Sequence, residues 1–560
     1  YRHQRCSVGL DADHGDTDLS PYRKPRFRKV EKVERIEGLD HLITHSPILI
    51  IAIPLVAAFL TPLIGMRSKE ARNALVIGSL VFAAFLVFAL ARDVVINGIH
   101  VYTLGATSPG QTIPTGFMVP VRIILEVDGM SAFFGIIWAI VSLAAAIYSL
   151  SHIASETGQT RFYTLLLLMV TGGFGMMFTG DLFNLFVFLE IASISGGALI
   201  AFRTRFADTQ EGGFKYIVVS AIAGLMVLFA TGILYAQYNS LNIATLAQLI
   251  QYTTLDQIAL ALLLIAFAMK TGMVPLHLWF PDAYSVAPAS ISGMLVITSH
   301  ACMYAAFRVC FTLYGRVIDA PVVGWILIAF GLLTMFIGVT MAVFQKDVMR
   351  FMSYHAVSQL GYMWLGVGVG LAVLGNPGLL ATYGRDAMSG GIFHILNHAM
   401  YKPLLFFTGG ALFHCTGTRD LTKMGGLAHK MKWTTILYII GTLSISGIPP
   451  LNGFSSKILI YESVYQFNPI FTIIGIIVSI LTLASFTKAF HSAFMGAELP
   501  EYRGVKEVPR SMIIAMGILA AGIVFITLFP SLIVDSTIHP AADALIDPNP
   551  YISAVTGVAS

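Results

Sequence analysis

Long apolar segments separated by short polar ones recur along the chain from residue 46 onward. A helix needs about 20 mainly apolar residues to cross the ~30 Å hydrocarbon core of a bilayer. The pattern predicts fourteen such helices and therefore an all-α polytopic membrane protein. The predicted spans cover residues 46–65, 73–91, 129–150, 163–180, 182–202, 214–236, 257–275, 289–312, 322–344, 352–374, 388–413, 433–453, 469–492 and 511–534.

The composition points to the same environment. Hydrophobic residues make up 56% and charged residues 11% of the 560 positions. Soluble domains carry roughly 25% charged residues, so this chain could not cover a water-exposed surface with charge. A soluble enzyme, a nucleic-acid-binding protein and a disordered scaffold are therefore excluded, and the lipid bilayer is the expected surrounding. The four cysteines form no CxxC pair, so no iron–sulfur cluster, disulfide framework or other metal site is indicated.

Five ionisable residues stand out in or beside the predicted spans, because a charge at the centre of a span costs roughly 2.5 to 3.5 kcal/mol on insertion scales. They are Glu190, Lys270, Lys402, Lys457 and Lys488. Lys488 lies one turn from the end of its span, where a long side chain can reach the membrane surface. The other four are candidates for proton translocation. For Glu190, a structural ion pair that locks two helices together is the alternative.

Proline and glycine interrupt the seventh and twelfth spans close to a lysine. Lys270 precedes the segment TGMVPLH, and Lys457 follows the segment SGIPPLNGFSS. Proline removes a helical hydrogen bond, which leaves a carbonyl that needs another partner. Broken helices at corresponding positions of two halves are typical of inverted repeats with an ion site at their interface.

This spacing divides the chain into six parts. They are a basic polar tail (1–45), N-terminal helices 1–3 (46–150), a first repeat of helices 4–8 (163–312), a second repeat of helices 9–13 (322–492), helix 14 (511–534) and a C-terminal tail (535–560).

The eleventh span carries His394, His398 and Lys402 at intervals of four residues, which places them along one face over about 12 Å. Imidazoles titrate near neutral pH and can both accept and donate a proton, so this stripe suits a proton relay. A bis-histidine haem site is the alternative. It would need histidines at matched depth on two facing helices.

Several other polar residues are further candidates. His300 lies alone in the eighth span, where a hydrogen-bonded core histidine is the alternative to a relay group. The secondary candidates are Asp181 at the mouth of the fifth span, His277 after Lys270, and His355 with Ser358 in the tenth span.

The loop charges predict an orientation. Lys and Arg are concentrated in the short loops that follow odd-numbered spans. Cytoplasmic loops carry an excess of these residues, which predicts both termini on the outer side of a prokaryotic plasma membrane. The basic N-terminal tail runs against this rule.

Five segments together resemble one known family. They are GDLFNLFVFLEIASISGGAL, KTGMVPLHLWFPDAYSVAPAS, YHAVSQLGY, FHILNHAMYKPLLFFTGGAL and SGIPPLNGFSSK, in this order. They look like the proton-translocating antiporter-like subunits. This family includes membrane-arm subunits of respiratory complex I, the A and D subunits of Mrp antiporters, and relatives in membrane-bound hydrogenases and sulfane reductases. The chain ends 26 residues past the last span without a lateral helix, so a D-type subunit is the expected match.

The resemblance implies fourteen helices with two inverted five-helix repeats and broken helices 7 and 12. It also implies roles for matching residues. Glu190 would pair with Lys270, and His300 stands at the central position of helix 8, eight residues before Arg308. The two histidines and the lysine of helix 11 would continue the relay, and Lys457 would end it.

The resemblance further implies membership of a multisubunit ion-pumping complex, with no active site and no cofactor of its own. The expected partners are small and large antiporter-like membrane subunits and H⁺. The complex would either carry a peripheral redox arm of hydrogenase, sulfane-reductase or complex I type, or exchange Na⁺ for H⁺ as part of an Mrp assembly. A membrane-anchored electron-carrying or quinone-reactive subunit, and a structural spacer with vestigial charges, are the alternatives.

Overall fold

The computed structural model describes residues 37–105 and 123–557. The chain divides after residue 42, and residues 43–560 form one body. Most of the predicted basic tail and Cys6 lie outside the described residues. Helix α1 (Glu37–Thr44) is the described part of that tail.

Eleven helices in the described part of the chain are long and apolar enough to cross a membrane, and each coincides with a predicted span. The chain is therefore a mostly helical, polytopic membrane protein. These helices are α2 (Ser46–Gly65), α3 (Lys69–Asn97), α4 (Gly129–His152), α5 (Gln159–Phe178), α6 (Leu182–Ile200), α7 (Ala207–Tyr238), α9 (Thr254–Thr271), α11 (Ala289–Phe307) with η1 (Arg308–Leu313), α12 (Ala320–Val343), α18 (Pro469–Phe490) with η5 (His491–Met495), and α19 (Arg510–Leu528).

The other three predicted spans correspond to helices that fall outside this group. They are α13 (Val348–Ala372), α15 (Arg385–Thr416) and α16 (Lys432–Ser446). Helix α16 has 15 residues, whereas α13 and α15 have 25 and 32 but carry several polar side chains. Those polar residues lower the hydropathy of α13 and α15.

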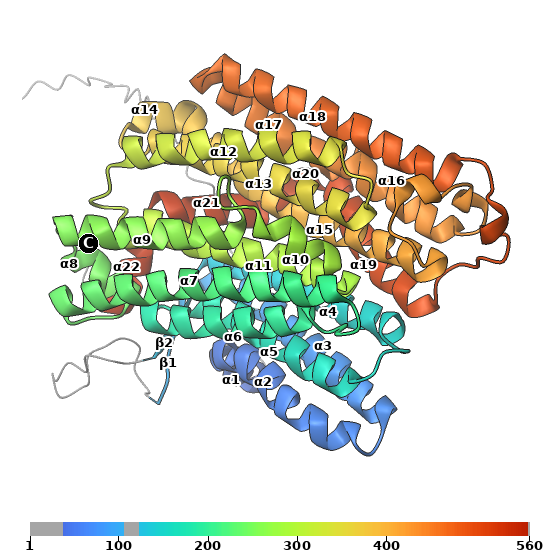
Figure 1. The fold of residues 1–560 in the computed structure, drawn as a ribbon. Coiled ribbons are helices and arrows are strands. Elements are labelled where there is room, and N and C mark those ends of the chain that lie inside the picture. Colours follow the sequence, from blue (N-terminus) through green and yellow to red (C-terminus); the bar gives the residue numbers. More distant parts are fainter. Residues whose placement is uncertain (1–36, 106–122, 558–560) are drawn as a thin grey trace, which may run out of the picture. The chain divides into compact units, whose positions relative to one another are not determined.

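Helices α11, α13 and α15 form the interior (Figure 1). Each is buried along almost its whole length. Helix α15 packs against α11, α13, α16, α19 and α17 (Asn452–Phe467), and α11 also packs against α4 and α9. A helix that is enclosed in this way presents every face to protein. Polar side chains on it must therefore find partners within the bundle.

The two predicted helix interruptions are present. Helix α9 ends at Gly272 with a φ of +75°, and α10 (Trp279–Val286) begins seven residues later. Helix α16 ends at Gly447 with a φ of +73°, and α17 begins at Asn452. Glycine adopts this left-handed conformation without a Cβ clash, so it ends both helices. The predicted limit at residue 453 was wrong, because α17 continues from there to Phe467.

One expectation is corrected by a pair of short strands. Strand β1 (His100–Thr103) pairs in antiparallel register with β2 (Ile124–Val127), so the fold is not purely α-helical. The predicted C-terminal tail folds into short helices. The remaining elements are α8 (Ile243–Leu249), α14 (Pro377–Leu379), η2 (Leu380–Gly384), η3 (Leu421–Lys423), η4 (Leu427–His429), η6 (Pro500–Tyr502), α20 (Pro530–Ile533), η7 (Val534–Ile538), α21 (His539–Ile546) and α22 (Asn549–Thr556).

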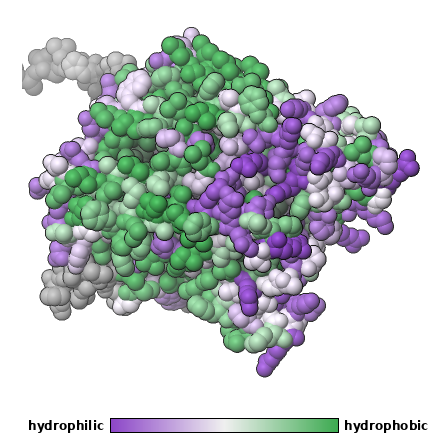
Figure 2. All heavy atoms as spheres, in the orientation of Figure 1, coloured by the Kyte–Doolittle hydropathy of each residue, from purple (hydrophilic) through white to green (hydrophobic). Residues whose placement is uncertain are grey.

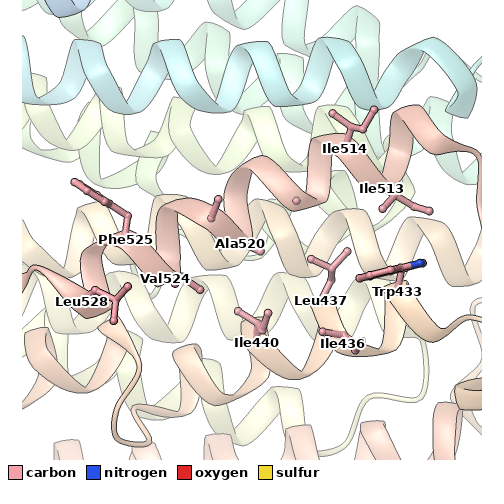
Figure 3. Close-up of a pocket in the computed structure, with 12 residues that line it drawn as sticks. Trp433, Ile436, Leu437, Ile440, Ile513, Ile514, Ala520, Val524, Phe525 and Leu528 are labelled. Carbon is pink, nitrogen blue, oxygen red and sulfur yellow. The ribbon is translucent and has the colours of Figure 1, made fainter.

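The outer surface is apolar, as contact with lipid requires. Figure 2 shows hydrophobic residues over most of the visible face, with polar residues gathered toward its right-hand side. Phe59 and Phe214, for example, are 68% and 69% exposed. An apolar groove of about 700 Å³ runs between α16 and α19, lined at its ends by Trp433 and Leu528 (Figure 3).

Candidate functional site

A hydrogen-bonded histidine pair lies at the centre of the interior. Nε2 of His300 on α11 and Nδ1 of His398 on α15 are 2.9 Å apart, and both residues are almost fully buried. One of these two nitrogens must carry the proton and the other must accept it. The outer nitrogens, His300 Nδ1 and His398 Nε2, have no hydrogen-bond partner among the described residues. A proton can therefore move between the two imidazoles, and the two outer nitrogens can each take up or release a further proton.

His394 lies one turn away on α15 and faces α13 and α17. Its Nδ1 is 3.0 Å from Oγ of Ser456, and its Nε2 is 3.2 Å from Oε1 of Gln359. The hydroxyl of Tyr401 lies 3.3 Å from the same Nε2. The Tyr401 ring also contacts His398 edge-on, with centroids 5.5 Å apart. Tyr401 thus touches both histidines of α15.

Lys457 continues this line on α17. Its Nζ donates to the carbonyl of Ile445 at 2.8 Å and to Oγ of Ser479 at 3.0 Å. Ile445 belongs to the last turn of α16, where unsatisfied carbonyls and the helix dipole favour a cation. The Tyr362 ring lies 5.0 Å from Nζ of Lys457 and 5.4 Å from the His394 ring. Tyr362 therefore bridges the last two groups of the line.

Lys270 lies at the other broken helix. It lies in the last turn of α9 with 2% of its surface exposed. Its Nζ donates to Oγ of Ser193 at 2.7 Å and of Ser220 at 2.8 Å, and it lies 4.8 Å from the Tyr216 ring. Both ammonium groups thus lie near the C-terminal end of a helix that precedes an interruption, and both contact serine hydroxyls, although Lys457 itself belongs to the start of α17.

Glu190 is near Lys270 but makes no ion pair with it in the described part of the structure. The two charges interact, yet no Glu190 oxygen approaches Nζ within 4 Å. Oε1 of Glu190 rests instead against Gly224 of α7, where an added Cβ would lie 1.9 Å from it. Ser193, one turn after Glu190 on α6, takes the contact that the resemblance assigned to the carboxylate.

The Lys402 side chain has different neighbours from the two histidines on the same helix. Its Nζ is fully buried without a hydrogen-bond partner among the described residues. It lies 5.6 Å from the Phe406 ring and 5.8 Å from the Phe486 ring, which stabilise a cation through their π faces. His355 flanks Phe486 as well, at 4.6 Å, and its Nε2 contacts Oγ of Ser485 at 2.8 Å. Lys402 and His355 therefore form a side branch.

The remaining secondary candidates have local partners. Ser358 donates to the carbonyl of Met335 on α12, whereas His355 contacts Ser485 on α18. His277 lies buried between α9 and α10. Asp181 caps α6 by accepting from the backbone of Asn184 at 2.8 Å, and burial raises the pKa of Asp181 to about 6.

Sequence reasoning missed the neutral groups that connect these charges. Ser193, Ser220 and Ser479 hold the two lysines, and Gln359 and Ser456 hold His394. Each lies in a segment that carries a predicted site residue, or on a helix next to such a segment. A serine in an apolar helix is too common to single out, since it can bond to its own backbone.

Comparison with known proteins identifies the family of the chain. Residues 179–482 match the family described as NADH:quinone oxidoreductase/Mrp antiporter, TM, and this segment contains α6 to α17. The chain belongs to this family. The D-type subunit of the Na⁺/H⁺ antiporter of Alkalihalophilus pseudofirmus is 33% identical, over 76% of this chain and 81% of that protein. The N-type subunit of the NADH-quinone oxidoreductase of Desulforudis audaxviator is 32% identical, over 89% of this chain and 99% of that protein.

The fold of this family member also matches a solved assembly. The Mrp complex from Dietzia sp. contains a chain that aligns with a TM-score of 0.80 and 24% identity, covering 92% of this chain and 99% of that one. The two sequence relatives are named as subunits, and this structure is of a complex. The relatives of this chain therefore work within multisubunit membrane assemblies.

Proposed function

We propose that this chain is a proton-conducting, antiporter-like subunit of D type within a multisubunit ion-pumping complex. Protons would move through Lys270, His300, His398, His394 and Lys457. The complex is either a redox-driven respiratory assembly or an Mrp-type Na⁺/H⁺ antiporter in a prokaryotic plasma membrane. In this proposal α13, α15 and the α16–α17 pair also cross the membrane, which gives fourteen spans. Two inverted repeats (163–312 and 322–492) would then form the pathway, with both termini outside.

The observation that carries this proposal is the buried line from His300 to Lys457. Direct polar contacts join His300 to His398 and His394 to Ser456, the residue next to Lys457. Tyr401 links the two histidines of α15. Such a row of titratable groups is costly in an apolar bundle unless it moves ions or pairs with counter-charges. Here the partners are neutral hydroxyl, amide and carbonyl groups, which suits proton transfer better than a structural ion-pair network.

The path from Lys270 to His300 runs past the aromatic residues of α10 in this proposal. The Tyr216 ring contacts Trp279, which contacts Tyr284. The Tyr284 hydroxyl lies 2.7 Å from Oγ of Ser299, next to His300 in sequence. These hydroxyls, together with water, supply donors and acceptors between the two groups.

Glu190 would control this pathway through its charge. An approach of the carboxylate toward Lys270 would make the lysine hold its proton more tightly, and its withdrawal toward Gly224 would release that proton. Each charge that crosses the membrane field is worth about 2.3 kcal/mol per 100 mV, so modest changes in this interaction suffice for coupling. Lys402 and His355 would store charge beside the main line. The driving reaction belongs to partner subunits.

The geometry of the histidine pair argues against the haem alternative. His300 and His398 do lie on two facing helices. However, a metal ion bound between two imidazoles would hold the nitrogens about 4 Å apart. The observed 2.9 Å is a hydrogen-bond distance.

Native mass spectrometry with proteomics of the detergent-extracted assembly tests the host complex. Co-purified hydrogenase, sulfane-reductase or complex I-like subunits would identify a redox-driven pump. Small Mrp-type membrane subunits alone would identify a secondary antiporter. A chain that extracts without any partner would contradict the proposal.

A mutation at Ser456 tests the link between His394 and Lys457. Ser456→Ala removes one hydrogen bond worth about 1 kcal/mol, so the initial rate of proton translocation should fall about fivefold. The rate is measured with a pH-sensitive dye in vesicles that contain the assembled complex. Ser463→Ala is the control, because this serine of the same helix donates to the carbonyl of Leu459 instead. Equal rates for the two variants would place the pathway elsewhere.

A further inference from the structure

A second group of buried ionisable residues lies at one end of the helices, apart from the line described above. Glu126 belongs to β2 and is fully buried. Its Oε1 accepts a hydrogen bond from Nδ2 of Asn242 at 2.7 Å, whereas Oε2 has no partner with hydrogen-bond geometry among the described residues. The backbone at Gly180 presses against this carboxyl group, since an added Cβ there would lie 2.1 Å from its carbon. The site is thus tightly built around a carboxyl group that lacks one partner.

The nearby positive charge is already taken by another acid. Arg308 forms an ion pair with Asp128, and both side chains are 2% exposed. Arg308 also donates to Oγ of Ser131 at 3.0 Å and to the hydroxyl of Tyr304 at 3.0 Å. Glu126 therefore has no cation of its own. Burial raises the pKa of Glu126 to about 8, and its contacts with Tyr551, Asn242 and Arg308 only partly offset this effect.

Helix α11 connects this group to the histidine pair. His300, Tyr304 and Arg308 follow one another at intervals of four residues and so lie along one side of the helix. The chain changes from α-helix to a π-helical turn at Arg308, and such turns are frequent at functional sites. The Tyr304 hydroxyl contacts Ser131 and donates to the carbonyl of Met177. A hydroxyl therefore stands one helical turn from His300 and one turn from Arg308.

The C-terminal helix α22 covers the group. The Tyr551 ring lies 4.5 Å from the guanidinium of Arg308, and its hydroxyl interacts with Glu126. Arg316 holds the start of α22 through Asn549, and Gln248 holds its end through Thr556. Strand β2 and helices α8 and α22 lie together at the left of Figure 1, with the end of the chain. The predicted orientation places this end outside.

We propose that Glu126 is a proton-exchange group at the outer end of the pathway, linked to His300 through Tyr304 and covered by Tyr551 of α22. This inference rests on the proposed function. In the exchange step the O–H bond of the Glu126 carboxylic acid breaks and its proton passes to a water molecule. The positive charge of Arg308, although paired with Asp128, offsets part of the charge of the carboxylate that remains. Reprotonation reverses the step.

A proton fits this group better than a metal cation does. A hard cation takes several oxygen ligands, whereas Glu126 offers only Oε2 without a partner of hydrogen-bond geometry among the described residues, and the Tyr551 hydroxyl already interacts with this carboxyl group. No group of three His, Cys, Asp or Glu residues in the described chain could hold a metal ion. The guanidinium of Arg308 would also repel a second cation.

Infrared difference spectroscopy of the assembled complex in liposomes tests this assignment. We expect a carbonyl band of a protonated carboxylic acid that disappears as the pH rises through about 8. The band should be absent in Glu126→Gln and retained in Glu498→Gln, which removes a half-exposed acid at the opposite end of the helices. Proton translocation by Glu126→Gln should be about 100-fold slower. A band that persists in Glu126→Gln, or a wild-type translocation rate, would overturn the proposal.

Two further variants keep the test decisive. Tyr551→Phe retains the ring over Arg308 but removes the hydroxyl, so it should shift the carboxylic acid band while leaving the fold intact. An unchanged band would contradict the contact, even if Glu126→Gln fails to assemble. Lys270→Met should block translocation yet retain the Glu126 band. If Lys270→Met translocates normally, the proposed function fails while the protonation of Glu126 can still be read from its band.

Discussion

Proton translocation by the assembled complex is expected to fall about 100-fold when Lys270 is replaced by methionine. Methionine has a similar length and fills the same apolar space, but it cannot hold or pass a proton. The variant should still fold, because Ser193, which loses its contact with Lys270, still donates to the carbonyl of Leu189 within its own helix. The initial rate of acidification is measured with a pH-sensitive dye in inverted vesicles, at equal amounts of assembled complex.

Lys488→Met is the matched control for this experiment. Lys488 also lies in an apolar helix, near the end of α18, but its side chain is exposed and it takes no part in the buried line. We expect its rate to equal that of the wild type. A wild-type rate in Lys270→Met would exclude this lysine, and with it the pathway from the first broken helix.

The second large effect is on stability. Arg308→Met leaves the carboxylate of Asp128 buried without its counter-charge, which typically costs about 3–5 kcal/mol. Asp128 also caps α4, accepting from the backbone of Ser131 at 2.9 Å, so the damage should reach the start of that helix. The midpoint of thermal unfolding of the purified complex, followed by intrinsic fluorescence, should fall clearly.

A double variant separates the charge from the packing. Asp128→Asn removes the negative charge and keeps a side chain that caps helices well. The pair Arg308→Met with Asp128→Asn should therefore recover most of the lost stability. Arg161→Met, which changes an exposed arginine at the start of α5, should alter stability by less than about 0.5 kcal/mol. If Arg308→Met alone were as stable as the double variant, the ion pair between Arg308 and Asp128 would contribute little to stability.

The positions of the long helices could be predicted from the sequence because lipid imposes a simple requirement. A spanning segment must be long, apolar and internally hydrogen-bonded, and eleven predicted spans meet this in the structure. The helix interruptions near Lys270 and Lys457 were also predictable, since proline and glycine act on their own local backbone. The limits of α17 and the strands β1 and β2 were not. Their short segments carry too few apolar residues to stand out, and packing decides their conformation.

For the candidate site too, some features could be predicted from the sequence and others could not. Charged and imidazole side chains are rare in apolar helices, so Lys270, His394, His398, Lys402 and Lys457 were visible in the chain alone. Which of them meet was not visible, because it depends on how separate helices rotate and cross. The link between His300 and His398 joins residues 98 positions apart in sequence. Lys402 shares a helix with both histidines of α15, yet it turns toward Phe486 of α18.

By itself, then, the sequence determined a polytopic membrane protein of the antiporter-like family with buried ionisable groups and two broken helices. These features follow from hydropathy, from local backbone chemistry and from rare residue types. The tertiary structure alone decided that serine hydroxyls hold Lys270 and that Tyr551 closes over Glu126 and Arg308. These contacts join segments far apart in the chain. They arise from side-chain packing between helices, whose geometry leaves no periodic or compositional trace along a single sequence.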